Sequence, residues 1–238
     1  GTAILARGRS PKEAPTMSKP LRSNFTPGTP RWAVRRAQWK SLGLTDADLE
    51  KPKIAVINTS SELSSCFSHL DGVSARVKAA IRAAGGLAFE VRTAAPSDFI
   101  TSAGRQGRYI LPSRDLLVND IEVQVEGAML DGMVCLASCD KTAPGQLMAA
   151  ARLDIPSLVV ACGYQPHGHL DGRAVDIEEV YESVGKVGAG HQPPGQRPRH
   201  VGDALPGDSR AQRQNRDRHR HLIGQRLLGG RMEQRRRF

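Results

Sequence analysis

Short apolar segments alternate with segments of helical periodicity across the middle of the chain, and this alternation constrains the fold more than any other feature. The apolar segments lie at 54–57, 87–92, 132–137 and 158–161. Their length and composition are typical of buried strands. Strands that alternate with helices at this spacing predict an α/β fold, with a parallel sheet, right-handed crossovers and flanking helices.

Three helices are predicted between these strands, and a fourth precedes them. The helix at 70–84 ends at a Gly-Gly pair, another opens near Pro112, and a third covers 146–153 with Pro144 and Gly145 helping to start it. The predicted buried faces are Leu70, Val73, Val77, Ile81 and Ala84, then Leu116, Leu117, Ile121 and Val125. An earlier helix over 31–44 is predicted to use Trp32, Val34, Trp39 and Leu42 as its apolar members.

Reactive side chains follow three of the predicted strands. Cys66 comes after the first strand and Asp98 after the second, while Cys139, Asp140 and Lys141 come directly after the third. The carboxyl ends of parallel strands share one edge of the sheet, where ligands bind in open α/β folds. We therefore expect these side chains to converge on one site.

The chemistry of these residues favours a soft metal centre beside a hard one. Thiolates prefer iron–sulfur clusters or zinc, whereas carboxylates prefer magnesium. Two cysteines cannot complete a closed structural zinc site, and the sequence has no C-x-x-C pair. Cys135, inside a strand, and Cys162, at the end of one, are interpreted as small buried hydrophobic residues.

Each site residue also has a simpler interpretation when it is taken alone. Asp98 fits a turn or a helix cap, Asp140 fits a cap for the following helix, and Lys141 fits a solvated charge. Further along, His167 and His169 with Asp171 could suggest a metal site, but the surrounding Gly and Pro favour a surface loop. The acidic residues within 175–184 are interpreted as the solvated face of a short helix.

The net charge of +10 is concentrated at the end of the chain. Residues 191–238 contain twelve Arg, no Lys and four acidic residues, which leaves a net charge of only +2 for the first 190 residues. No apolar run approaches the roughly 18 residues of a membrane span. Four unevenly spaced cysteines, without a signal-peptide pattern, favour a reducing cytosol.

Several segments together resemble one enzyme family. Residues 139–145, followed by 148–152 and 155–156, resemble the signature of the dihydroxy-acid dehydratase and phosphogluconate dehydratase family, which includes sugar-acid dehydratases. Residues 58–63 with Cys66 and His69, and residues 109–115, are similar to further segments of that family. The resemblance covers roughly 19–190.

The resemblance implies two cofactors. Cys66 and Cys139 would bind an iron–sulfur cluster, for which we favour 2Fe–2S and leave 4Fe–4S open. Asp98, Asp140 and Lys141 would bind magnesium, with Lys141 carrying a carbamate. In this family an iron atom acts as the Lewis acid and magnesium positions the substrate carboxylate, so that loss of water from a 2,3-dihydroxy acid gives a 2-oxo acid.

The sequence departs from the family in its last part. No cysteine follows Cys162 to serve as the third cluster ligand, and the C-terminal β-barrel domain, which supplies the base serine, does not appear. We therefore expect an α/β domain truncated before that barrel, with no catalytic residue of its own and no activity alone. The implied reaction is that of dihydroxy-acid dehydratase in branched-chain amino-acid biosynthesis. A sugar-acid dehydratase and a non-catalytic binding protein remain the alternatives.

The expected organisation has three parts. Residues 1–16 are interpreted as a non-native or upstream leader, 17–190 as the partial dehydratase domain and 191–238 as an Arg-rich tail. We interpret the tail either as the product of a frame shift near Gly190 or as a disordered nucleic-acid-binding arm, and we favour the frame shift. The resemblance also implies a homodimer that binds a small dihydroxy acid in the cytoplasm, without nucleic acid or membrane.

Overall fold

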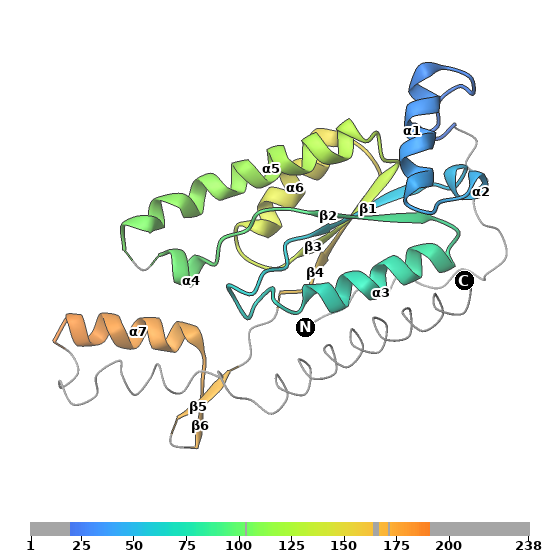
Figure 1. Ribbon diagram of the computed structural model, residues 1–238. Helices are drawn as coiled ribbons and strands as arrows, with labels where there is room; N and C mark the ends of the chain where they lie inside the picture. The colour runs from blue at the N-terminus through green and yellow to red at the C-terminus, as the bar shows by residue number, and fades with distance from the viewer. Residues whose placement is uncertain (1–19, 103, 164–166, 171, 191–238) are drawn as a thin grey trace, which may run out of the picture. The chain divides into compact units, whose positions relative to one another are not determined.

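The computed structural model describes residues 20–102, 104–163, 167–170 and 172–190. The chain divides into two compact units between residues 164 and 165. The first unit holds a four-stranded sheet with its helices, and the second holds a two-stranded hairpin and one helix (Figure 1). The proposed leader at 1–16 and the tail at 191–238 lie outside the described residues.

The sheet of the first unit is entirely parallel, as the sequence predicts. Its strands are β1 (Lys53–Asn58), β2 (Leu87–Arg92), β3 (Gly132–Ala137) and β4 (Ser157–Ala161), in the order β2-β1-β3-β4. All four strands were predicted at these positions to within one residue at each end. Because the strands run parallel, their carboxyl ends share one edge of the sheet.

Helices cover both faces of this sheet (Figure 1). Helix α3 (Leu70–Ala83) packs on one face, and α5 (Ile110–Gly127) with α6 (Thr142–Leu153) packs on the other. A short helix α4 (Asp98–Thr101) and a 3₁₀ helix η1 (Arg105–Tyr109) lead from β2 into α5. The segment that contains Gly104 and Gly107 therefore includes helical turns.

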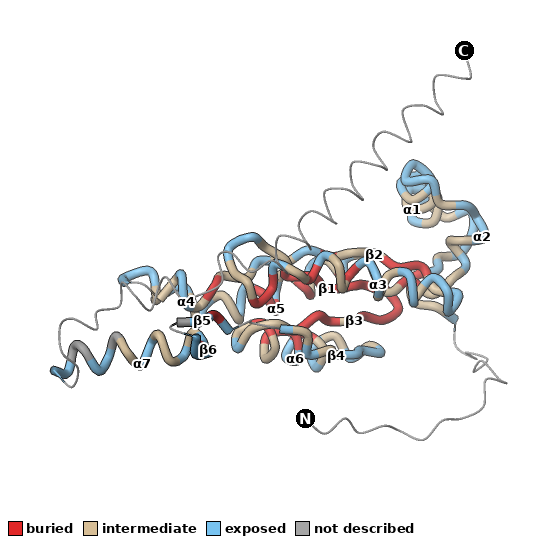
Figure 2. Tube along the Cα trace, turned by 90° about the horizontal axis from the view of Figure 1, so that it is seen from below, coloured by how far each residue is buried: buried red, intermediate tan, exposed pale blue. Residues whose placement is uncertain are grey.

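Two apolar clusters fill the spaces between the sheet and its helices. The alternation of side chains along β1 sends Ala55 and Ile57 toward α5 and α6, and Val56 toward α3. Figure 2 shows the buried segments concentrated along the central strands β1 and β3. Each fully buried Val, Leu or Ile side chain stabilises the fold by about 1.5–3 kcal/mol. This core holds the strand ends, and hence the site, in fixed positions.

Two glycines are required by the local geometry. Gly85 follows α3 with φ of 85°, in the left-handed region that Gly adopts without strain, so it ends the helix. Gly145 lies where α6 crosses α5, and a Cβ there would lie 2.8 Å from Leu117 Cδ2. The missing side chain allows the two helices to pack closely.

Helices α5 and α6 differ from the prediction at their starts. Helix α5 begins at Ile110 and α6 at Thr142, in each case before the proline that was expected to open the helix. Proline fits both positions because it lies in the first turn, where no intrahelical N–H bond is needed. Within α5, Leu116 was predicted to be buried but is exposed, and Val118 is buried instead.

The segment before the sheet forms α1 (Pro30–Ser41) and α2 (Asp46–Leu49). Thr29 caps α1 by accepting from the N–H of Trp32 at 3.3 Å, and Thr45 with Asp48 forms a capping box at the start of α2. This helix was predicted. None of its residues is fully buried, but Trp32 and Trp39 are half-buried, and the ring of Trp39 stacks on that of Phe89. The guanidinium of Arg35 stacks between the rings of Phe25 and Trp39.

A buried lysine attaches this segment to the amino end of β1. Lys53 Nζ donates to Ser23 Oγ at 2.9 Å, to Asn24 Oδ1 at 2.7 Å and to the carbonyl of Leu49 at 2.6 Å. The carboxylate of Asp131 accepts from the Lys53 backbone N–H at 2.8 Å and from Ser23 Oγ at 2.6 Å. This polar cluster lies at the edge of the sheet opposite the predicted site.

The second unit contains a hairpin of β5 (Gly168–Leu170) and β6 (Arg173–Val175), followed by α7 (Ile177–Gly188). The helix was predicted, whereas the surface loop expected at His169 is a strand. The rings of His167 and His169 are exposed and lie 5.2 Å apart, and Asp171 lies outside the described residues. Among the described helices of both units, none combines the length and apolar character of a membrane span.

Candidate functional site

The structure brings the two loop cysteines together at the carboxyl edge of the sheet. Cys66 lies in the loop after β1 and Cys139 in the loop after β3, and their sulfur atoms are 2.8 Å apart. Because β1 and β3 are adjacent and parallel, residues 73 positions apart in sequence meet at one edge. The predicted convergence of these thiols is confirmed.

The loop that carries Cys139 is fixed by the side chain of Thr142. Thr142 Oγ1 accepts from the backbone N–H of Cys139 at 2.8 Å and from that of Ser138 at 3.1 Å. It also interacts with the carbonyl of Cys139 at 3.1 Å, at the first turn of α6. Thr142 was not among the predicted site residues. It is the first residue of α6, and its hydroxyl bonds back to the loop rather than to the helix.

Cys66 occupies an apolar environment, although the residues before it in its loop are mostly polar. The residue is buried, and the adjoining Phe67 and Leu70 are fully buried in the cluster between α3 and the sheet. Its polar neighbours are the hydroxyl of Ser64, 3.0 Å from the sulfur, and the thiol of Cys139. The cysteine is thus anchored by packing, with its sulfur directed to the sheet edge.

The chain after β4 closes against the same loop. The backbone N–H groups of Cys162 and Gly163 both donate to the carbonyl of Ala137, at 2.8 and 3.1 Å. A Cβ at position 163 would overlap the carbonyl of Ser138, so glycine is the residue that permits this approach. His69 Nε2 lies 2.8 Å from the Cys162 carbonyl and links this loop to the start of α3. Sequence reasoning did not identify Gly163.

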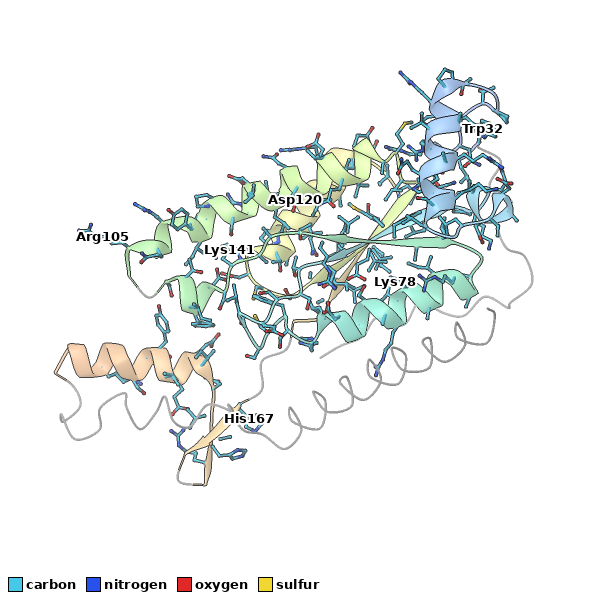
Figure 3. The ribbon with its side chains drawn as sticks, viewed as in Figure 1. Trp32, Lys78, Arg105, Asp120, Lys141 and His167 are labelled. Carbon is cyan, nitrogen blue, oxygen red and sulfur yellow. The ribbon has the colours of Figure 1, made fainter. Side chains whose placement is uncertain are left out.

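Asp98, Asp140 and Lys141 form the second part of the site. Lys141 Nζ lies 2.6 Å from Asp140 Oδ2 and 4.0 Å from Asp98 Oδ1. The side chains of Lys141 and Asp98 are 18% and 21% exposed, whereas that of Asp140 is 67% exposed. Figure 3 labels Lys141 where the sheet edge meets the start of α6. Asp98 is held at the first position of α4, after the capping residue Ser97.

The two carboxyl groups influence each other's ionisation. Burial, together with the hydrogen bond and negative charge of Asp140, raises the pKa of Asp98 to about 6. The hydrogen bond from Asp98 lowers the pKa of Asp140. The hydrogen bond with Asp140 raises the pKa of Lys141 above its usual value. Below about pH 6, Asp98 and Asp140 therefore share one proton. Above that pH both carboxyl groups are ionised and lie beside the ammonium of Lys141.

The thiols and the carboxylates belong to one electrostatic environment. The hydrogen bond from Cys139 lowers the pKa of the Cys66 thiol to about 7, and the reciprocal interaction raises that of Cys139. The negative charge of Asp98 opposes the ionisation of both thiols. For Cys66 this effect is smaller than that of the hydrogen bond from Cys139, so its pKa is still lowered. A positive ion bound near Asp98 would consequently favour ionisation of both sulfur groups.

The other two cysteines take no part in this pair. Cys135 is fully buried within β3, and burial raises its pKa to about 12, as expected for a small core residue. Cys162 packs beside the cluster between α3 and the sheet and donates its thiol hydrogen to the Ala137 carbonyl at 3.4 Å. Both positions agree with the interpretation of these cysteines as packing residues.

The carboxylates of Asp98 and Asp140 suit a hard divalent cation that takes its other ligands from water and substrate. They do not form a complete metal site by themselves. Asp98 Oδ1 is buried and has no hydrogen-bond partner within the described residues. No grouping of three His, Cys, Asp or Glu side chains in the described ranges could hold a metal ion by itself. Magnesium, however, commonly binds through one or two carboxylates together with water and substrate oxygens. Two adjacent carboxylates, one with a buried oxygen that accepts no hydrogen bond within the described residues, meet that requirement.

Comparison with known sequences gives a match over most of the described chain. The family model described as "Dihydroxy-acid/6-phosphogluconate dehydratase N-terminal" matches residues 51–207. The matched residues include every residue of the site and run beyond residue 190, where we expected the resemblance to end.

Several curated relatives are named dihydroxy-acid dehydratase. The dihydroxy-acid dehydratase of Methanococcoides burtonii is 41% identical over 170 residues, which is 71% of this chain and 31% of that protein. Those of Pyrococcus abyssi and Desulfitobacterium hafniense are 42% and 44% identical over 158 residues, or 66% of this chain and 29% and 28% of theirs. The chain thus spans about a third of the length of the curated relatives it matches.

Proposed function

Because the chain belongs to the dihydroxy-acid/6-phosphogluconate dehydratase family through its N-terminal region, we propose that it forms the metal-binding half of a hydro-lyase active site. The substrate would be a 2,3-dihydroxy carboxylic acid and the product a 2-oxo acid. Branched-chain amino-acid biosynthesis is the proposed pathway, since the relatives are named dihydroxy-acid dehydratases. A sugar acid is the alternative substrate, because dihydroxy acids of both kinds present the same carboxylate and vicinal hydroxyls.

One observation carries this proposal. A thiol pair and a carboxylate–lysine group lie at the same sheet edge, and Asp98 acts electrostatically on both sulfurs. Soft sulfur ligands and hard oxygen ligands favour different metals, so their proximity supports two metal centres that share one substrate.

The residues of the chain have separable roles in this proposal. Cys66 and Cys139 would bind iron as thiolates, so each thiol loses its proton when iron binds. Asp98 and Asp140 would bind magnesium. Because the pKa of Asp98 is raised, this carboxyl group must lose its proton before it can bind the ion. When bound, an iron–sulfur cluster with an open iron supplies a Lewis acid for the departing hydroxyl, and magnesium supplies positive charge for the substrate carboxylate.

The form of Lys141 decides whether it helps or opposes cation binding. As an ammonium it repels a cation, whereas a carbamate made with carbon dioxide would present anionic oxygens. Carbamate formation needs the neutral amine, and the hydrogen bond with Asp140 disfavours that form. If Asp140 held a magnesium ion, the amine of Lys141 would lose this hydrogen-bond partner, and its carbamylation would be favoured. Intact mass spectrometry under carbon dioxide, with and without magnesium, tests this order of events.

Magnesium binding by this chain can be measured with manganese as a paramagnetic substitute. We expect Asp98→Asn and Asp140→Asn each to weaken manganese binding at least tenfold, about 1.4 kcal/mol or more, because each removes a charged ligand. Binding to the unchanged chain should weaken as the pH falls through about 6, where Asp98 takes up a proton. Asp115→Asn is the matched control, since Asp115 is exposed on α5.

Iron binding and turnover are tested on the same chain under anaerobic conditions. After incubation with iron, sulfide and magnesium, we expect bound iron that depends on Cys66 and Cys139 and not on Cys135. Turnover of dihydroxyisovalerate is compared with that of an aldonic acid by assay of the 2-oxo acid. The resemblance places the base serine and the third cysteine of the family in a further domain, so we propose that turnover requires that domain together with this chain. Equal iron binding by Cys66→Ser and the unchanged chain would contradict the proposal.

A further inference from the structure

The sulfur atoms of Cys66 and Cys139 are closer than ordinary van der Waals contact, and both residues are free cysteines. All four cysteines of the chain lie in the described residues, so their environments can be compared directly. Cys135 is fully buried, and the thiol of Cys162 donates to the Ala137 carbonyl. Neither forms a hydrogen bond with another thiol in the part of the chain that the structure describes. The site therefore contains one dithiol pair.

Both members of the pair are held in position by the fold. Cys139 is held by the hydrogen bonds of Thr142 to its backbone, and Cys66 by the packing of its neighbours Phe67 and Leu70. A disulfide has an S–S bond of about 2.0 Å, so the 2.8 Å separation must shorten by less than about 1 Å. Such a change is within reach of side-chain rotation without rearrangement of the strands.

We propose that Cys66 and Cys139 form a reversible disulfide when the metal-free chain meets a peroxide. One thiolate attacks a peroxide oxygen, the O–O bond breaks, and a sulfenic acid and water are formed. The second thiol then attacks that sulfur, the S–S bond forms, and the sulfenic oxygen leaves as a second water. Two thiols are oxidised by two electrons, hydrogen peroxide is reduced to two water molecules, and a dithiol reductant reverses the change.

This bond would protect the site and close it to metals at the same time. A sulfur atom in a disulfide cannot act as a thiolate ligand, so oxidation and metal binding exclude each other. It also prevents further oxidation of either thiol to an irreversible acid. The inference rests on the thiol geometry and not on the proposed dehydratase activity.

The test uses the full 238-residue chain, freed of metal with a chelator, reduced, and then treated with hydrogen peroxide. We expect free thiols, counted after denaturation, to fall from four to two, with the intact mass lower by two hydrogens. Peptide mapping without reductant should link the Cys66 peptide to the Cys139 peptide. Oxidation of the chain in denaturant should instead give mixed pairings, which shows that the fold directs the reaction.

Variants provide the second part of the test. The double variant Cys135→Ser with Cys162→Ser should form the same bond, whereas Cys66→Ser and Cys139→Ser should give sulfenic or sulfinic acid on the remaining thiol. A Cys139–Cys162 link as the main product, or two unlinked thiols in the double variant after peroxide, would overturn the inference. Because iron is absent throughout, these outcomes are distinct from failure of the proposed function.

Discussion

The hydroxyl of Thr142 accepts a hydrogen bond from the backbone N–H of Cys139 at 2.8 Å. It also accepts the N–H of Ser138, so one buried oxygen satisfies two donors of the site loop. Thr142→Val keeps the shape of the side chain and leaves both donors without this partner. We expect the free energy of unfolding to fall by about 1–3 kcal/mol, measured by chemical denaturation.

Thr142→Ser is the control for this prediction, because it keeps the hydroxyl and removes only a methyl group. It should lose much less stability than Thr142→Val. If the two variants unfold at the same denaturant concentration, the hydroxyl contributes no more to stability than the methyl group, which would contradict the proposed role of its hydrogen bonds.

The sheet and the convergence at its edge could be predicted because they follow from local patterns and from one general rule. Buried parallel strands appear as continuous apolar runs, and the carboxyl ends of such strands meet at one edge. Cys66 and Cys139 could therefore be placed together before any contact was known. The role of Thr142 could not be predicted in this way, because its hydroxyl bonds to the loop before α6 and does not cap the helix.

Burial and ionisation could not be predicted, because they depend on partners distant in sequence. Leu116 and Val118 are both apolar residues of α5, and only the position of α6 and the sheet decides that Val118 is buried. The apolar surroundings of Cys66 come from Phe67, from α3 and from the strands, and the polar residues before Cys66 give no sign of them. The mutual pKa shifts of Asp98 and Asp140 require their side chains to meet, which spacing alone does not determine.

The buried ammonium of Lys53 should be essential for attachment of the N-terminal segment. Lys53→Met leaves Asn24 Oδ1 and the Leu49 carbonyl without their donor and removes positive charge near Asp131. We expect a loss of about 2–4 kcal/mol in the free energy of unfolding. Lys51→Met is the control, since that side chain is 43% exposed and, among the described residues, its ammonium pairs only with the Asp48 carboxylate. Similar losses for the two variants would contradict a special role for Lys53.

The raised pKa of Asp98 should give stability a characteristic pH dependence. Between the unfolded value near 3.8 and the folded value of about 6, the folded chain binds more protons, so this group's contribution to stability falls as pH rises. Asp98→Asn removes this pH-dependent fall in stability, because asparagine does not ionise. Relative to the unchanged chain, we expect the variant to gain on the order of 1 kcal/mol at pH 7 and to gain nothing near pH 4. Thermal unfolding across this pH range is the measurement, and a gain independent of pH would contradict it.

Gly163 lies where a Cβ would overlap the carbonyl of Ser138. Gly163→Ala must displace the loop that carries Cys139, so we expect a loss of about 1–3 kcal/mol and slower formation of the Cys66–Cys139 disulfide. Gly127→Ala is the matched control, because a Cβ at the end of α5 meets no atom within 4 Å. It should leave disulfide formation unchanged and raise stability by about 0.5–1 kcal/mol, as expected for alanine in a helix. Thermal unfolding and thiol counting after peroxide treatment measure both effects. Equal rates of disulfide formation in the two variants would show that the Gly163–Ser138 approach does not set the position of Cys139.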